Sequence, residues 1–386
     1  MVAQELKRAP DTPVEMAEML RRASEERLSV VIRGAGTKKD WGRTPQRIDA
    51  ILSTRGLRRV LAHQHGDLTA TIEAGAALRD VNLALSLHKQ WLPLDPSFAG
   101  EATIGGILAA NDSGPLRHRY GTPRDLVIGT QVATADGLLA KSGGQVVKNV
   151  AGYDLSKLLA GSFGSLAAIA TATFKLSPLP AASRTLIAAA RDAEELNRLV
   201  LEVMASQLEP IAFEIHVPTF ALLLRFASVP AAVEAQVHAA QVLFGAAKLV
   251  EGEAERALWT EHNQRIWAGA GAVIRASWLP ANVAAAIGEL KTSAATTGVL
   301  GTELLGRAAL GTGLIRIDGN ANAQARAIDQ LRASAWFGNV VLLRGSAELK
   351  GLVDVWGSHG DREPLFASLK RAFDPQGILN AGRGPL

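Results

Sequence analysis

The sequence predicts a two-domain α+β fold, and three observations lead to this fold class. With 386 residues, the chain is too long for one ordinary hydrophobic core. Up to residue 180, short strands and glycine-rich turns follow one another without the regular βαβ alternation of a doubly wound sheet. After the Ser-Pro-Leu-Pro run at 177–180 the dense glycine patterns stop, and strands then alternate with helices, as in an antiparallel sheet covered by helices.

The composition limits the classes of function. The net charge is +4, from 41 basic and 37 acidic residues, and no long Lys/Arg run supports a nucleic-acid partner. The chain has no cysteine, which excludes disulfides, thiol nucleophiles and cysteine-ligated zinc or iron–sulfur clusters within it. The N-terminal residues lack the apolar core of a signal peptide, and no apolar run reaches the ~18 residues of a spanning helix. We therefore expect a cytoplasmic protein, attached to a membrane at most peripherally through partners.

The first part of the chain is predicted to contain one long helix followed by short strands. Residues 13–26 have apolar or small side chains at helical spacing and an acidic start, which is typical of an amphipathic helix. Asp136-Gly137 is a hairpin signal between two strands. The expected strands are 28–32, 48–53, 59–62, 68–73, 126–134, 138–141 and the apolar end of 161–176, with a helix at about 78–87.

The second part is predicted as alternating strands and helices. The expected strands are 184–189, 212–216, 221–226, 272–277, 313–317 and 340–343. The expected helices are 193–206, 230–244, 253–268, 280–296 and 321–335. A short helix and the run FDPQGILNAGRGPL follow at 363–386.

The turn that ends the first strand is the most informative motif. In the run SVVIRGAGTKK at 29–39, a buried strand leads into Gly-Ala-Gly, whose backbone N–H groups have no side chain in the way. This geometry suits a phosphate or diphosphate, and neighbouring lysine and arginine residues add positive charge. As a Rossmann fingerprint the run fails, because Lys39 replaces the third glycine and no acidic residue closes a following strand. The residues around the expected anion are Arg33, Gly34, Ala35, Gly36, Thr37 and Lys38.

A second glycine-rich segment, at 90–114, could supply another wall of the same site. Residues 103–110 are predicted to start a helix whose first N–H groups face a ligand. Each motif also has a purely structural interpretation. The glycine pair could be a helix–helix contact, Asn111 and Ser113 a helix C-cap and turn, and 161–164 a hairpin turn. Together and in this order, the motifs favour a cofactor site.

Motifs spread over the first 180 residues and the tail resemble flavoproteins of the vanillyl-alcohol oxidase / p-cresol methylhydroxylase (PCMH) type. Within that superfamily the chain resembles the FAD-binding E subunits of bacterial glycolate oxidases, above all in the run VVKNVAGYDLSKLLAGSFG. The other motifs are RGAGTKKDWG at 33–42, EAG at 73–75, LPLDP at 92–96, GEATIGGILAAN at 100–111, YGTPRDLVIGTQV at 120–132 and FDPQGILNAGR at 373–383.

The resemblance implies a PCMH-type FAD-binding domain at 1–180, an α+β cap domain at 181–345, and a C-terminal segment, 346–386, that returns to the FAD domain. FAD is expected to bind non-covalently, because the turn lacks the histidine of covalently flavinylated relatives. The cofactor-binding residues that the resemblance implies are Arg33, Gly34, Ala35, Gly36, Thr37, Lys38, Pro96, Ala102, Thr103, Gly105, Gly106, Asn111, Ser113, Gly114, Gly164, Ile169 and Asn380.

Three residues are candidates for the chemistry above the flavin. Lys148 could place a cation beside the flavin pyrimidine, or belong to a plain loop. Arg275 could hold a substrate carboxylate with two hydrogen bonds, although an arginine on a surface strand is more common. His359, in a glycine-rich loop near the tail, could take the hydroxyl proton of the substrate. Arg344 is a weaker alternative to Arg275.

His63 and His65 share one face of an expected strand. Two imidazoles at this spacing can bind a metal ion, but no third ligand is evident in the sequence. A solvated sheet edge is therefore the favoured interpretation, and no metal site is predicted.

The substrate side departs from the related 2-hydroxy-acid dehydrogenases, which carry a Gly-Asp-Gly-Asn-Leu-His type of motif in the cap. The nearest run here, at 316–320, has no histidine. Three functions therefore stay open. The first is a redox subunit of a glycolate oxidase-like complex, oxidising glycolate or D-lactate to the 2-oxo acid by hydride transfer to flavin, with other flavin and iron–sulfur subunits as partners. The second is a non-catalytic assembly or electron-relay subunit, and the third a stand-alone FAD-dependent hydroxy-acid or alcohol dehydrogenase.

Overall fold

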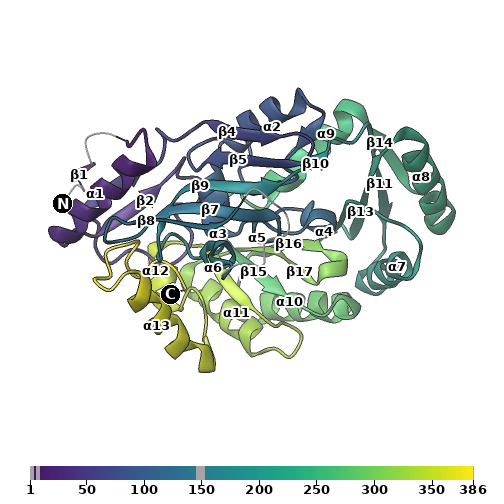
Figure 1. The fold of residues 1–386 in the computed structure, drawn as a ribbon. Coiled ribbons are helices and arrows are strands. Elements are labelled where there is room, and N and C mark those ends of the chain that lie inside the picture. The colour runs from purple at the N-terminus through teal and green to yellow at the C-terminus, as the bar shows by residue number, and fades with distance from the viewer. Residues whose placement is uncertain (1–3, 6–8, 145–152, 386) are drawn as a thin grey trace. The chain divides into compact units, whose positions relative to one another are not determined.

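The computed structural model describes residues 4–5, 9–144 and 153–385 (Figure 1). The chain forms two compact units. The first consists of Met1–Gly114, Tyr120–Leu179 and His359–Leu386, and the second of Pro115–Arg119 and Pro180–Ser358. The domain roles expected from the sequence stay predictions. They are FAD binding for 1–180, a cap for 181–345, and a C-terminal segment at 346–386 that returns to the FAD domain.

A five-stranded antiparallel sheet forms the centre of the first unit, and Figure 1 shows β4, β5, β9 and β7 side by side. The middle strand β9 is buried from Ala168 to Phe174, because both faces of the sheet are covered. The predicted Asp136-Gly137 turn joins β7 to β8, with Gly137 at a φ of +80°. The strand order is β4 (Val60–Gln64), β5 (Thr69–Glu73), β9 (Ala168–Lys175), β7 (Val127–Ala133) and β8 (Leu139–Gly143).

The second sheet of this unit is small and parallel. Helix α1 (Pro13–Glu25) begins at Thr12, whose hydroxyl accepts a hydrogen bond from Glu15 N, with proline at the first helical position. The apolar stripe of α1, which includes Met16 and Leu20, shares one core with Val30 of β2. The strand order is β1 (Gln4–Glu5), β3 (Ala50–Ser53) and β2 (Val30–Arg33).

The main core of the first unit contains residues of the five-stranded sheet together with two short helices. Leu78 and Val81 of α2 and Ile107 of α3 belong to the same buried cluster as Ile72 and Phe174 of the sheet. A separate pair of strands, β6 (Gln90–Trp91) and β10 (Ser177–Pro178), is antiparallel. The helices are α2 (Leu78–Ser86), α3 (Ile104–Ala110), α5 (Pro123–Leu126), α6 (Leu155–Leu159), the 3₁₀ turn η3 (Gly360–Arg362) and α13 (Glu363–Phe373), and the residues of α4 (Arg117–Tyr120) are divided between the two units.

An eight-stranded sheet forms the second unit, and all its pairings are antiparallel. The central strand β12 is buried at every position, so both faces of the sheet are covered there. The strand order is β14 (Lys248–Glu251), β11 (Ala182–Ala189), β13 (Ala221–Ser228), β12 (Ala212–Val217), β16 (Gly301–Arg307), β17 (Thr312–Asp318), β15 (Ala272–Ser277) and β18 (Val340–Arg344).

Helices cover this sheet, and α10 packs against both α7 and α11. None of the helices in the described part of the chain has the combined length and apolarity needed to cross a membrane. The helices of the unit are α7 (Ala193–Ala205), α8 (Pro230–Phe244), α9 (Gly252–Arg265), η1 (Pro280–Asn282), α10 (Val283–Thr297), η2 (Ala308–Leu310), α11 (Ala321–Ala333) and α12 (Ala347–Leu352).

Two strands of the eight-stranded sheet are absent from the sequence-based prediction. Strand β16 lies near the centre of the sheet, yet its buried Glu303 and Arg307 interrupt the apolar pattern by which a central strand is recognised. Strand β14 is an exposed edge strand with too few apolar residues to predict it. The helix expected at 280–296 begins as a 3₁₀ turn and becomes α-helical at Val283.

Candidate functional site

The turn after β2 has two positions that favour glycine. Gly36 has a φ of +80°, in the left-handed region that most side chains disfavour. At Gly34 the backbone passes so close to Thr103 that an added Cβ would lie 2.1 Å from its Oγ1 atom. The turn therefore exposes main chain, rather than side chains, along the residues that the sequence predicts to bind an anion.

Helix α3 approaches the same turn through its own glycines. Thr103 is the N-cap residue of the helix. Gly105 donates its N–H to the carbonyl of Ala74 at 2.8 Å, and an added Cβ at Gly105 would lie 2.8 Å from the Ala74 Cβ. A Cβ on Gly106 would lie 3.2 Å from Thr103 Oγ1. The paired glycines thus allow the first turn of α3 to pack close to the end of β5 and to the glycine turn.

A cleft of about 590 Å³, counted with its open mouth, lies along the turn. It is lined by residues 31–39, by α3, by Phe163 and by Arg383 of the tail. The structure therefore brings the two glycine-rich segments together at one cavity. The sequence-predicted residues in its lining are Arg33, Gly34, Ala35, Gly36, Thr37, Lys38, Thr103 and Gly106.

A second cleft, of about 380 Å³, adjoins the first. The two share lining residues, among them Ile32, Ala109 and Phe163, so together they form an elongated depression. The sequence-predicted residues Gly105, Gly164, Ile169 and Asn380 line this second cleft.

Asn380 connects the tail to two walls of the second cleft. Its Oδ1 accepts a hydrogen bond from Ile32 N at 3.2 Å, and its Nδ2 donates to the carbonyl of Phe163 at 2.7 Å. The residue is fully buried and has a φ of +43°, a conformation that asparagine tolerates better than most residues. Both ends of the amide are therefore engaged in holding the cleft together.

The charge of Lys38 is balanced inside the unit. Its Nζ lies 3.1 Å from Asp112 Oδ2 and 3.2 Å from the carbonyl oxygen of Ser97, and both partners of the ion pair are buried. Asp112 also accepts a hydrogen bond from Ser97 N at 2.9 Å. Lys38 thus joins the glycine turn to the loops before and after α3, and its net contribution to the field in the cleft is reduced.

Arg383 brings a further positive charge to the cleft, and it was absent from the predicted site residues. It donates Nε to the carbonyl of Trp41 at 3.1 Å and Nη2 to the carbonyl of Lys38. Burial lowers the pKa of Arg383, with Asp40 acting in the opposite direction, but a guanidinium stays protonated at neutral pH. This arginine ends the motif FDPQGILNAGR, so the motif was the sequence signal by which it could have been added to the predicted site residues.

Several predicted cofactor-binding residues line neither cleft and lie in supporting positions. Asn111 is the left-handed C-cap of α3, and its Oδ1 accepts from Arg124 N at 3.0 Å. Gly114 packs so closely on Asp95 that an added Cβ would lie 2.2 Å from its carbonyl oxygen. The cofactor contacts of this group stay predictions: Pro96, Ala102, Asn111, Ser113 and Gly114.

Of the three proposed catalytic residues, two lie in the described part of the chain. Lys148 lies outside the described residues. His359 packs its ring edge-on against Phe366, with centroids 5.0 Å apart, and its Nε2 is buried without a hydrogen-bond partner in the described part of the chain. Arg275 lies half-buried on β15 of the second unit, opposite Leu314 and Val341. Their catalytic roles stay predictions.

Arg344 has a structural use that the sequence does not show. Its guanidinium donates to the carbonyl oxygens of Trp267 at 2.7 Å, Gly269 at 3.1 Å and Gly271 at 2.9 Å. Three carbonyl partners on one loop favour a role in holding the chain between α9 and β15.

The second unit contains buried pairs of polar side chains that sequence reasoning missed. His262 Nε2 lies 3.2 Å from Glu214 Oε2, and His216 Nε2 lies 2.9 Å from Glu303 Oε1. Burial lowers the pKa of His216, against the opposing effect of Glu303. Arg307 Nε lies 3.7 Å from Glu214 Oε1. Glu214 and His216 alternate with apolar residues on β12. Because alternate residues of a strand share one face, this pattern could have predicted a sheet face with polar side chains.

Comparison with known proteins identifies the domain around the clefts. Residues 6–143 match the family described as FAD binding domain. Glycolate oxidase subunit GlcD of Bacillus subtilis (strain 168) is 32% identical over 222 residues, covering 57% of this chain and 47% of that protein. Glycolate oxidase subunit GlcE of Escherichia coli (strain K12) is 35% identical over 199 residues, covering 51% and 55%. The chain thus contains an FAD-binding domain and is similar to glycolate oxidase subunits.

This FAD-binding protein is also similar to a D-lactate dehydrogenase of Archaeoglobus fulgidus (strain ATCC 49558), with 33% identity over 205 residues, which are 53% of this chain and 46% of the relative. The chain spans about half the length of the curated relatives that it matches. Among solved structures, alkyldihydroxyacetonephosphate synthase superposes with a TM-score of 0.68 at 15% identity, over 96% of this chain and 76% of that one. The predicted fold, a PCMH-type FAD-binding fold of the α+β class, is confirmed.

FAD is the cofactor of this family, and the clefts of the flavoprotein fit it. A dinucleotide diphosphate needs bare main-chain N–H groups and nearby positive charge. The glycine turn supplies the first, because Gly34 and Gly36 leave its backbone uncovered. Lys39 and Arg383 in the lining supply the second. The adjoining cleft extends the depression beyond the turn, as a long cofactor requires.

Proposed function

We propose that this chain is the FAD-binding redox subunit of a glycolate oxidase-like complex that oxidises a 2-hydroxy acid, glycolate or D-lactate, to the 2-oxo acid. The observation that carries the proposal is the pair of adjoining clefts around the glycine turn of an FAD-binding domain. The similarity to glycolate oxidase subunits and to a D-lactate dehydrogenase supports the class of substrate.

The turn after β2 would hold the diphosphate of FAD without a covalent bond. Its main chain from Arg33 to Lys38 borders the larger cleft, and Thr103 and Gly106 of α3 lie across the same lining. Gly164, Ile169 and the buried Asn380 would contact the cofactor beyond the diphosphate. Because the walls are joined by hydrogen bonds of Asn380, the site would be largely formed before FAD enters.

In the proposed reaction, bound FAD would accept a hydride from the carbon that carries the substrate hydroxyl. Arg275 would hold the substrate carboxylate through two parallel hydrogen bonds, which fixes the orientation of that carbon. His359 would take the hydroxyl proton, so that loss of a hydride and a proton leaves the 2-oxo acid. Lys148 would place a positive charge near the cofactor.

Partner subunits belong to this proposal because the chain has no cysteine to ligate an iron–sulfur cluster. Any such centre would lie on another subunit, as would a second flavin. The chain's match to about half the length of GlcD and GlcE is compatible with a division of tasks among subunits.

A specific observation favours a second function, an electron-relay or assembly subunit without its own substrate chemistry. The run 316–320 is the nearest match in this chain to the histidine motif of related dehydrogenases, but it has no histidine, and its side chains serve the fold. Arg316 Nη1 lies 2.9 Å from Glu303 Oε2, and Asn320 caps α11 by accepting from Ala323 N at 2.9 Å. Neither residue resembles a base or a metal ligand.

A spectroscopic experiment separates the two functions. The purified chain is reconstituted with FAD and mixed anaerobically with glycolate or D-lactate. A redox subunit would lose its flavin absorption. At subsaturating substrate, Arg275→Lys would slow this loss much more than the control Arg198→Ala. Arg198 is an exposed residue on α7 of the same unit. A chain that binds FAD but keeps its absorption with both acids supports the relay function. A chain that binds no FAD contradicts both.

A further inference from the structure

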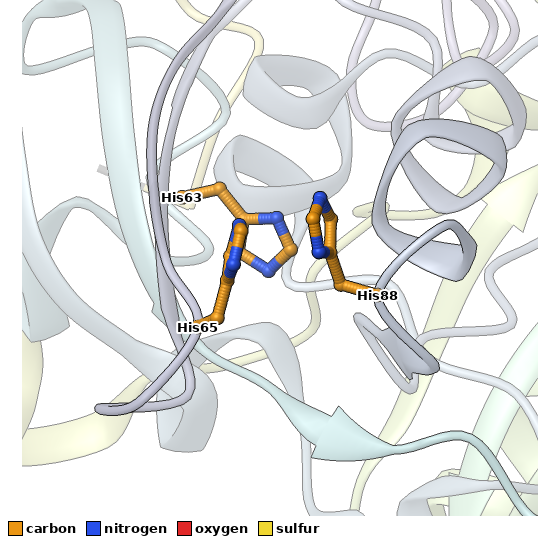
Figure 2. Close-up of side chains that lie close together, drawn as sticks. All are labelled: His63, His65 and His88. Atoms are coloured by element: carbon orange, nitrogen blue, oxygen red, sulfur yellow. The ribbon is translucent and has the colours of Figure 1, made fainter.

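Three histidines meet on the surface of the first unit, although only two of them are near one another in the sequence. His63 lies on β4, the outermost strand of its sheet, and His65 just beyond that strand. His88 follows helix α2 and joins them from the turn before β6. One potential ligand nitrogen of each residue lies within 4.8 Å of the others. Figure 2 shows the three rings turned toward one another.

The rings form one compact cluster. The ring centroids of His65 and His88 are 3.6 Å apart in a stacked arrangement, and His63 lies 4.2 Å from His65 and 5.3 Å from His88, edge-on to both. Three protonated imidazoles at these distances would repel one another. The neutral imidazole is the form that binds metal ions.

A buried glutamine fixes the orientation of His63. Gln90 Nε2 donates to the carbonyl of His65 at 2.9 Å, and a carbonyl can only accept, so the amide nitrogen must lie on that side. Gln90 Oε1 therefore faces His63 Nε2, at 2.8 Å, and that ring nitrogen must carry the hydrogen. This leaves His63 Nδ1 with a lone pair. A histidine that donates one N–H to an amide oxygen and offers the other nitrogen is the usual arrangement at metal sites.

We propose that His63, His65 and His88 bind one divalent late transition-metal ion, such as Zn²⁺, which ties the edge strand β4 to the turn after α2. Three imidazole nitrogens are a ligand set that Zn²⁺, Cu²⁺ and Ni²⁺ accept, and water fills the remaining position. Tetrahedral zinc with Zn–N bonds of about 2.0–2.1 Å needs its nitrogens about 3.3 Å apart. His65 and His88 are exposed and free to rotate inward, so the cluster can contract to this spacing.

The site is independent of the flavin. None of its histidines lines either cleft, and the experiment reads metal binding directly. The full chain, without an affinity tag and freed of metal with a chelator, is titrated with Co²⁺ and followed by visible absorption. Zn²⁺ is then added as a competitor. We expect one equivalent of Co²⁺ to give ligand-field absorption that one equivalent of Zn²⁺ abolishes, and Zn²⁺ to raise the melting temperature.

Variants decide whether this cluster is responsible. His65→Ala and His88→Ala each should weaken Zn²⁺ binding by at least about 10-fold, the smallest loss seen even for outer-shell partners, and Gln90→Ala should weaken it by about 10- to 100-fold through the lost orientation of His63. His238→Ala is the matched control, because His238 is an exposed histidine on α8 of the other unit. His63→Ala should weaken Zn²⁺ binding in the same way, and His63→Gln replaces it if it fails to fold.

Two results would overturn the proposal. One is the absence of a saturable Zn²⁺ site in the native chain at micromolar metal. The other is a site whose affinity changes no more in the folded His65→Ala and His88→Ala variants than in His238→Ala.

Discussion

At Gly34, an added methyl group would overlap the side chain of Thr103. The nearest atom to an added Cβ would be Thr103 Oγ1 at 2.1 Å, and the same glycine lines both clefts. The absence of a side chain at this position is thus what allows strand β2 and helix α3 to approach each other beside the clefts.

We predict that Gly34→Ala weakens FAD binding by about 10- to 100-fold, because overpacking costs about 1–3 kcal/mol and each 1.4 kcal/mol is a factor of ten. Fluorescence titration of the FAD-free chain measures the affinity. Gly66→Ala is the control, since nothing lies within 4 Å of its added Cβ. Gly34→Ala combined with Thr103→Ala should bind FAD better than Gly34→Ala alone. Equal affinities for the native chain and Gly34→Ala would contradict the assigned close contact.

His118 is a second residue whose environment has a measurable effect. Burial lowers the pKa of His118 below its usual 6.5, which outweighs the opposite influence of Glu214, while Arg119 lowers it further. Its Nδ1 is buried and has no hydrogen-bond partner among the described residues. The neutral ring is therefore favoured in the folded chain, while the unfolded chain binds a proton at higher pH.

The free energy of unfolding should therefore fall as the pH drops below about 6.5, where the unfolded state binds more protons than the folded state. Each unit of depression in this pKa corresponds to about 1.4 kcal/mol. His118→Gln should make the decline shallower, whereas His238→Gln, at an exposed position, should leave it as in the native chain. Urea unfolding between pH 5 and pH 8 measures the difference, and identical slopes for the native and His118→Gln chains would contradict the prediction.

Among the elements, the tail has the clearest mechanical role. Leu379 forms a parallel bridge with Val30, and Lys370 Nζ donates to the carbonyl of Ser165 at 2.7 Å. Asn380 then links β2 to the turn at Phe163. The tail thus joins two elements that border the clefts.

We predict that Asn380→Gly destabilises the first unit, since glycine keeps the left-handed backbone but removes both side-chain hydrogen bonds. Each buried group left without a partner costs about 1–3 kcal/mol. Asn320→Gly is the matched control, because an N-cap asparagine replaced by glycine costs only a few tenths of a kcal/mol. Denaturant unfolding measures the stability, and FAD titration measures the affinity. If both substitutions lowered the stability equally, Asn380 would not stabilise the first unit as proposed.

Local patterns in the sequence predicted the helices, strands and turns better than the tertiary contacts between them. The amphipathic stripe of α1, the hairpin at Asp136-Gly137 and the glycine turn all follow from neighbouring residues. Strand β16 was missed because the buried Glu303 and Arg307 find their partners on other strands. The sequence likewise could not show that Asp112 would balance Lys38, or that His88 would reach His63. Such contacts depend on chain segments that fold together from distant positions.

At the scale of the whole molecule, the second unit is largely an insertion in the first. The chain leaves the first unit after Leu179 and returns at His359. Each unit has a buried apolar cluster of its own, around Phe174 in the first and around Trp259 in the second. A unit with its own core can unfold on its own.

Scanning calorimetry of the FAD-free chain should therefore show two transitions. FAD at 100 times its dissociation constant should stabilise the first unit by about 2.7 kcal/mol, by mass action, and raise only one of the two melting temperatures. Gly34→Ala should remove most of that increase. A single transition that FAD shifts as a whole would show instead that the two units unfold together.

The hydrogen bond between Ile32 and Asn380 joins residues 348 positions apart, and this separation sets the order of events during synthesis. A ribosome that has made only the glycine turn, α3 and the five-stranded sheet has produced neither Asn380 nor Arg383. The growing chain therefore cannot close the cofactor cleft. FAD would therefore be captured by nearly finished chains rather than by short nascent ones.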